Sequence, residues 1–216
     1  MRNFITQEWL TVFTILGLLA IAIAKYLNAL RFSHYMWAVV NSKYLKIYAK
    51  DLKFTDSFSS LLFFNLCVSA SVFLYLCYSI FILPKAFEII PFLYLMLLVS
   101  GVVIIKILLE RFIGYIFDIT GVIDSYLFQK FSIINYMGFI LCMANVLLLF
   151  TELHPKIITI TSIVLICLIY SIGCITSFKT HQKIIIPNFF YFLLYLCALE
   201  IAPYILLYKV VSGYNV

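Results

Sequence analysis

The sequence predicts an all-α, polytopic membrane bundle, and three observations lead to that class. Of its 216 residues, 65% are apolar and only 11% are charged, whereas a soluble domain carries about 25% charged residues. The apolar residues form long stretches, and a helix needs roughly 20 such residues to cross a bilayer. These stretches lack the two-residue alternation of barrel strands, which leaves helices as the structure that satisfies the backbone in lipid. The soluble, nucleic-acid-binding and disordered classes are therefore excluded.

Six stretches are long and apolar enough to span the membrane. We expect the spans at about residues 6–24, 57–83, 89–110, 131–151, 157–178 and 187–208. The first is the shortest and resembles a signal peptide. However, Glu8 follows Arg2 closely and no small-residue cleavage site precedes Lys25, so we interpret it as a retained span. No repeat or flexible linker interrupts the chain, and residues 1–216 are expected to form a single membrane domain.

The basic residues predict the orientation of the spans. The loops after the first, third and fifth spans hold most of the 15 lysines and arginines, namely Lys25, Arg31, Lys43, Lys46, Lys50, Lys53, Lys106, Arg111, Lys130, Lys179 and Lys183. Because basic loops stay in the cytoplasm, we expect these three loops to be cytoplasmic and both termini to lie on the opposite side. The net charge of +6 is then a signal of topology and not of nucleic-acid binding.

The first long loop predicts an amphipathic helix on the membrane surface. Its apolar positions have helical spacing and are Phe32, Tyr35, Met36, Val39 and Val40. The lysines that follow share one basic face and are Lys43, Lys46, Lys50 and Lys53. We expect this face to contact anionic lipids of the inner leaflet, with each lysine contributing about 1 kcal/mol. A docking face for a partner protein is the alternative.

The second long loop predicts a similar interfacial helix. Its apolar face is formed by Ile119, Val122, Ile123, Tyr126 and Leu127. Just before this loop, the third span is expected to continue through Lys106 and Glu110, which are spaced as an i, i+4 pair. Asp56, beside Thr55 and Ser57, is a plausible N-cap for the second span.

Catalytic and metal-binding patterns are not found in the sequence. All six cysteines fall inside predicted spans without a C-x-x-C pair, so we interpret them as packing residues. The zinc-protease, nucleophile-elbow and P-loop motifs do not occur. We therefore expect no enzyme activity, no cofactor and no metal. A lipid enzyme, the weakest alternative, would require Glu110, Asp118 or Asp124 to converge near the headgroups.

Glu200 is the most unusual residue, because it lies deep inside the sixth predicted span. A charge at the centre of a span costs about 2.5–3.5 kcal/mol, so this carboxyl should face the bundle interior. Pro203 removes the amide that would bond the Leu199 carbonyl and leaves a free acceptor nearby. The polar side chains expected around it are Cys197, Tyr204, Asn145 and Ser71. This group is either a proton or cation site or a set of hydrogen bonds between helices.

The string Leu-Cys-Ala-Leu-Glu-Ile-Ala-Pro at residues 196–203 resembles the C-terminal signature of a bacterial family. That family consists of small multi-pass inner-membrane proteins of Bacteroidota and is known as domain of unknown function 4271. The resemblance implies that Cys197, Glu200 and Pro203 belong together, and it implies no reaction or cofactor. It also implies a bacterial inner membrane, in which the distribution of basic residues would place both termini in the periplasm.

Two functional hypotheses follow. The first is a non-enzymatic integral membrane subunit or accessory protein of an envelope assembly, with secretion or gliding machinery as an analogy. Its partners would be the lipid bilayer and either other inner-membrane proteins or further copies of itself, and no nucleic acid. The second is a small proton- or cation-coupled transporter or channel that uses Glu200.

Overall fold

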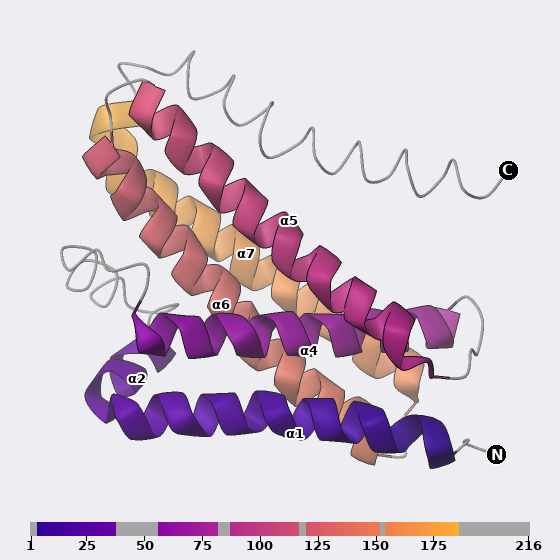
Figure 1. Cartoon of the computed structure of the whole chain (residues 1–216). Helices are drawn as coiled ribbons and strands as arrows, with labels where there is room; N and C mark the ends of the chain where they lie inside the picture. The colour runs from indigo at the N-terminus through magenta and orange to yellow at the C-terminus, as the bar shows by residue number, and fades with distance from the viewer. Residues whose placement is uncertain (1–3, 38–55, 82–86, 117–119, 152–153, 186–216) are drawn as a thin grey trace, which may run out of the picture.

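The computed structural model describes residues 4–37, 56–81, 87–116, 120–151 and 154–185, and this part of the chain is built from helices without a strand. The helices are α1 (Phe4–Leu27), α2 (Ala29–Met36), α4 (Ser57–Phe81), α5 (Ile89–Ile116), α6 (Thr120–Phe150) and α7 (Pro155–Ile185) (Figure 1). The all-α fold class is confirmed.

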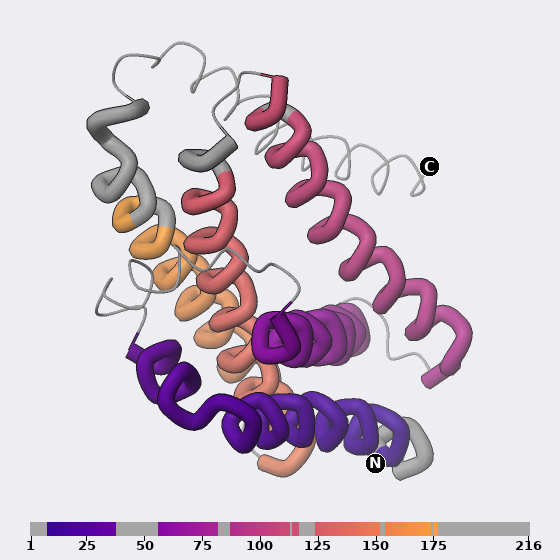
Figure 2. Tube along the Cα trace, turned by 60° about the vertical axis from the view of Figure 1, so that its left-hand side comes forward, coloured from indigo at the N-terminus to yellow at the C-terminus, as the bar shows by residue number. Residues whose placement is uncertain are grey.

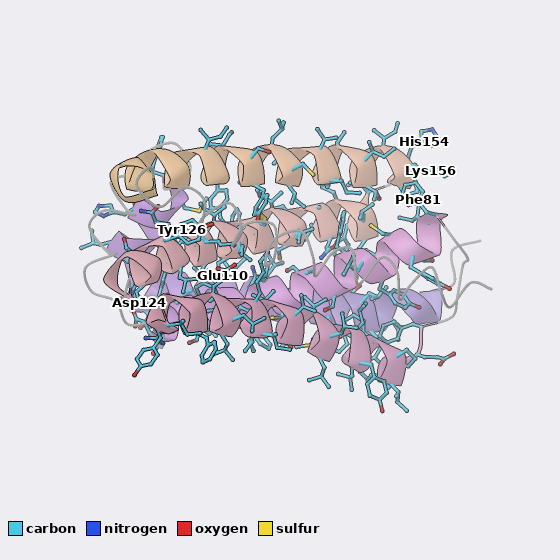
Figure 3. All side chains as sticks on the ribbon, turned by 90° about the horizontal axis from the view of Figure 1, so that it is seen from above. Phe81, Glu110, Asp124, Tyr126, His154 and Lys156 are labelled. Carbon is cyan, nitrogen blue, oxygen red and sulfur yellow. The ribbon has the colours of Figure 1, made fainter. Side chains whose placement is uncertain are left out.

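Five of these helices are long and apolar enough to cross a membrane, namely all except the short α2. They correspond to the first five predicted spans, so the protein is a polytopic helical membrane bundle. The sixth predicted span, residues 187–208, lies outside the described residues. Successive long helices run in alternating directions. Asp124 and Tyr126, at the start of α6, therefore lie near one end of the bundle, and His154 and Lys156 lie at the other (Figure 3).

The centre of the bundle is formed by α4 and α6. Helix α1 packs on one side of α4, α7 packs against α6, and α5 contacts both central helices (Figures 1 and 2). The two central helices meet at Gly138 of α6. A Cβ atom at this position would lie only 2.7 Å from the Leu66 Cα, so the absence of a side chain is what allows the backbones to approach. Small residues have this role in many membrane helix pairs.

The buried apolar side chains form clusters along the bundle. One lies at the end near α2 and contains Ala24, Tyr35, Phe58, Leu62 and Phe128. Two others lie toward the opposite end, where Phe92 of α5 packs with Leu10 and Val72, and where Phe73 of α4 packs with α6 and α7. Contacts between α5 and the bundle interior at that end are therefore made mainly through Phe92, which is fully buried.

Helix α2 is bound to the bundle and does not lie freely on the membrane surface. Tyr35 is 2% exposed, and its hydroxyl donates a hydrogen bond to the Ser132 carbonyl of α6 at 3.0 Å. The guanidinium of Arg31 pairs with the Asp56 carboxylate and stacks over the Phe58 ring at 4.9 Å. The expected lipid-facing position of Tyr35 is thus wrong, because the ring and hydroxyl find better partners inside the protein. Val39 and Val40 lie outside the described residues.

The second loop is much shorter than expected. Helix α5 continues to Ile116 and α6 begins at Thr120. The residues expected to form a separate interfacial helix therefore belong mostly to the first turns of α6. Sequence analysis placed the span boundaries at charged residues. The helices continue past those charges, and two ion pairs join α5 to α6 there.

Candidate functional site: a buried ion pair and a polar junction

The most unusual feature of the bundle is an ion pair buried between α5 and α6. Lys130 Nζ donates to Glu110 Oε1 at 2.7 Å, and the exposed fractions of the two side chains are 9% and 1%. Glu110 is buried between the helices, six residues before the end of α5 at Ile116, and lies toward the end of the bundle that holds Asp124 and Tyr126 (Figure 3). Both residues belong to helices that meet the criteria for a membrane span. Ionisable residues in such positions are costly and are commonly functional.

The pair is held in place by its neighbours on α6. The Lys130 ammonium lies 5.6 Å from the centre of the Tyr126 ring, one helical turn before it. An aromatic face attracts a cation by about 0.5–2 kcal/mol, with the larger values where water is excluded. The Glu110 carboxylate and the Tyr126 ring therefore both stabilise the Lys130 ammonium.

The Glu110 carboxylate is only partly satisfied. Oε1 accepts the bond from Lys130, whereas Oε2 is buried and has no hydrogen-bond partner among the described residues. An ionised carboxylate offers about four lone-pair positions. A buried acceptor without a donor costs about 1–3 kcal/mol, and more when it is charged. Oε2 is thus a buried acceptor that no donor among the described residues satisfies.

A second ion pair lies near the end of the same hairpin. Arg111 Nε is 3.4 Å from Asp124 Oδ1, and the exposed fractions of the two side chains are 58% and 20%. Exposed pairs of this kind contribute about 0–1 kcal/mol. The two carboxylates of the hairpin that the structure describes, Glu110 and Asp124, are therefore each matched by a separate cation. This arrangement gives no support to a convergence of Glu110 and Asp124 for lipid chemistry, and Asp118 lies outside the described residues.

Polar side chains also gather where α1, α4 and α6 meet. Asn145 Nδ2 of α6 donates to the Ser69 carbonyl of α4 at 2.8 Å, and the Ser69 hydroxyl donates to Asn65 Oδ1 at 3.1 Å. Gly17 of α1 covers this junction, since a Cβ there would lie 3.1 Å from Asn65 Oδ1. Both asparagines are fully buried. Asn65 Nδ2 and Asn145 Oδ1 have no partner in the described part of the chain.

The residues expected to surround Glu200 are placed only in part. Ser71 and Asn145 are both fully buried, on α4 and α6. The Ser71 hydroxyl donates to the Cys67 carbonyl at 2.7 Å, one turn back on its own helix, whereas Asn145 joins α6 to α4. Glu200, Cys197, Pro203 and Tyr204 lie outside the described residues, and so do Lys43, Lys46, Lys50 and Lys53.

Sequence reasoning did not identify Glu110 and Lys130 as partners. It placed Glu110 in an i, i+4 pair with Lys106 and used Lys130 as the limit of a span. A usable signal was present: Glu110 and Arg111 precede the turn, and Asp124 and Lys130 follow it, so opposite charges flank a single hairpin. Antiparallel helices joined by a short turn bring such residues together.

No metal centre is visible in the residues that the structure places: none of their His, Cys, Asp and Glu side chains form a group of three that could hold an ion. The described cysteines, Cys67, Cys77, Cys142 and Cys167, are free thiols.

A family described as "Domain of unknown function (DUF4271)" matches residues 10–211. No curated protein and no solved structure matches the chain.

Proposed function

The chain belongs to the DUF4271 family, whose description assigns no activity, and on the basis of its fold we propose that it is a non-enzymatic integral subunit of a membrane assembly. In this proposal it resides in a bacterial inner membrane, its three basic loops face the cytoplasm, and the assembly belongs to the cell envelope. Its partners are other inner-membrane proteins.

The observation that carries this proposal is the exposure of α5. Only 6% of its apolar window is buried, compared with 50% for α4 and for α6. Its outer face carries large apolar side chains that are more than half exposed, namely Ile90, Tyr94, Leu97, Leu98, Ile105, Leu108, Phe112 and Tyr115. Along this face the Gly101 position is open, with nothing within 4 Å of a Cβ added there. A helix with a central glycine and one face that the other described helices leave uncovered is suited to packing against another helix.

Affinity purification of the tagged protein from its native membrane in a mild detergent tests this proposal. We expect other membrane proteins to co-purify in fixed ratio. Replacement of Tyr94 and Phe112 by alanine should release them, because both side chains lie on the free face of α5. The matched control replaces Leu168 and Ile172, which are also exposed but on α7, and should leave the complex intact. A stable particle that contains only this chain would contradict the proposal.

A second candidate is a proton- or cation-coupled transporter or channel. The buried Glu110–Lys130 pair favours it, because a single carboxyl at Glu200 would give only one intramembrane ionisable group, and the pair adds two more. Purified protein in liposomes should then carry a proton or cation flux that Glu200→Gln or Glu110→Gln abolishes while the protein remains folded. Flux that is absent from the parent protein, or unchanged in both variants, would contradict this candidate.

A further inference from the structure

Helix α7 has one face that the other described helices leave uncovered. It packs on α6 and touches α4, and only 22% of its apolar window is buried, compared with 50% for α4 and for α6. Gly173 marks the opposite, buried face, since a Cβ there would lie 2.7 Å from the Ile133 Cδ1 of α6. The uncovered face consists of exposed side chains spaced three or four residues apart, namely Ile157, Thr161, Val164, Leu168, Ser171 and Ile175.

Two side chains of this face carry hydroxyl groups. The Ser171 hydroxyl donates to the Cys167 carbonyl at 2.8 Å, and the Thr161 hydroxyl donates to the Ile157 carbonyl at 2.9 Å. Each hydroxyl oxygen can still accept a hydrogen bond. Hydroxyl-bearing and small side chains are typical of contacts between helices in membranes. The face is therefore suited to another helix as well as to lipid.

The chain itself supplies a further span next to this face. Helix α7 ends at Ile185, and the sixth predicted span, residues 187–208, begins two residues later. Helices joined by so short a connection lie antiparallel and side by side. In Figure 3, α6 lies between α7 and α5, so a span that starts at the end of α7 would have to pass around α6 to reach the free face of α5. The uncovered face of α7 is therefore the nearer one.

We propose that the sixth predicted span folds back along α7 and covers its exposed face, with Glu200 at the level of Ser171. Residue 186 is the midpoint of the connection. Ser171 precedes it by 15 residues and Glu200 follows it by 14, so at a rise of about 1.5 Å per residue the two lie within about 2 Å of the same level. A carboxyl inside a span avoids lipid, and Ser171 is the hydroxyl that the uncovered face of α7 presents at this level.

The same register separates Glu200 from Asn145. The level of Ser171 is close to that of Gly173, which lies against Ile133 of α6, and Asn145 is twelve residues further along α6. Twelve helical residues extend for about 18 Å. Ser171 is thus the polar neighbour of Glu200, in place of the Asn145 and Ser71 expected from the sequence. The inference does not rest on the proposed function, because it leaves the free face of α5 to partner proteins.

Disulfide formation in the full-length protein in liposomes tests the proposal. Leu168→Cys is combined with Tyr204→Cys in a variant without the native cysteines, because these two positions are equally far from residue 186. Oxygen, with copper phenanthroline as catalyst, removes the two thiol hydrogens and joins sulfurs whose Cα atoms are about 4.4–6.8 Å apart. We expect a band of faster mobility in non-reducing electrophoresis, from a disulfide within one chain, and a reducing agent should remove it.

A second pair keeps the predicted span native and remains decisive if Tyr204→Cys does not fold. It combines Ile175→Cys with Cys197, the one native cysteine retained, and both positions are 11 residues from residue 186. The matched controls pair Tyr204→Cys with Ile105→Cys and Cys197 with Leu108→Cys, on the free face of α5, and should give no faster band.

Three outcomes would overturn the proposal. They are a disulfide in the α5 pairs, α7 pairs that stay reduced in a folded protein, and oxidation that joins two chains in place of one. Co-purification of partner proteins is a separate measurement, so a failure of the proposed function would leave the disulfide result unchanged.

Discussion

Gly138 is a position where a single methyl group should separate two helices. A Cβ there would lie 2.7 Å from Leu66 Cα and 3.1 Å from Leu66 N, and backbone atoms cannot move aside as the end of a side chain can. Gly138→Ala should therefore destabilise the protein by about 1–3 kcal/mol. The measurement is the thermal unfolding midpoint in detergent.

Gly101→Ala is the matched control for this change. The space around Gly101 is open, and alanine favours a helix over glycine by up to about 1 kcal/mol. The unfolding midpoint should be unchanged or slightly higher. Equal destabilisation by the two variants would contradict the close approach of α4 and α6.

Substitutions at Glu110 should lower the free energy of unfolding by different amounts, according to whether Lys130 keeps a hydrogen-bond acceptor. Glu110→Leu leaves a buried ammonium without a counter-charge and should cost about 3–5 kcal/mol. Glu110→Gln should cost less, because an amide oxygen can still accept the bond from Nζ. The double change of Glu110→Leu with Lys130→Met should recover most of the loss, since apolar pairs of similar volume commonly replace buried ion pairs without a penalty. Equal unfolding midpoints for Glu110→Leu and the double variant would show that the pair is not coupled.

For single residues, the sequence predicted which side chains are buried better than it predicted their hydrogen-bond partners. Ser71 and Asn145 were expected inside the bundle and are fully buried. Their hydrogen bonds, to Cys67 on the same helix and to Ser69 on α4, depend on helix rotation and register. One sequence does not determine those quantities. The pairing of Lys130 with Glu110 likewise depends on the register of α5 against α6, and the opposite charges in the sequence indicate only that such a pair can form.

Helix α2 shows what sequence periodicity can and cannot predict for an element. The apolar spacing at Phe32, Tyr35 and Met36 correctly indicated a helix. It did not indicate whether the apolar face contacts lipid or protein, because both environments favour the same side chains. The Arg31–Asp56 pair and the Tyr35–Ser132 bond settle that choice in favour of protein.

The attachment of α2 gives a prediction for Tyr35. Tyr35→Phe keeps the packing against Phe58 but removes the hydroxyl that bonds the Ser132 carbonyl. We expect a loss of about 0.5–1.5 kcal/mol and faster amide hydrogen exchange confined to α2 and to the adjacent turns of α6. Tyr26→Phe is a suitable control, because Tyr26 is 89% exposed. Unchanged exchange in Tyr35→Phe would contradict this role of the hydroxyl.

For the molecule as a whole, alternating helix direction predicts which loops can be reached from each side of the membrane. A cysteine in place of Lys156 should react with an impermeant thiol reagent added outside intact spheroplasts. A cysteine in place of Lys25, at the opposite end of the bundle, should react only after the membrane is opened. Both would be made in a variant without the native cysteines. The reverse pattern would contradict the orientation predicted from the basic loops.

The pairing of α5 with α6 has a consequence for how the chain enters the membrane. A charged residue inside a spanning helix is costly when that helix is inserted alone, by up to about 2.5–3.5 kcal/mol at the helix centre. Helix α5 carries Glu110 and α6 carries Lys130, so insertion one helix at a time would expose each charge to lipid before its partner arrived. If the two helices enter as a hairpin, the charges neutralise each other on the way in. We therefore expect the ribosome-bound chain to hold α5 at the insertion machinery until α6 has been synthesised, so that the ion pair acts during biogenesis as well as in the finished protein.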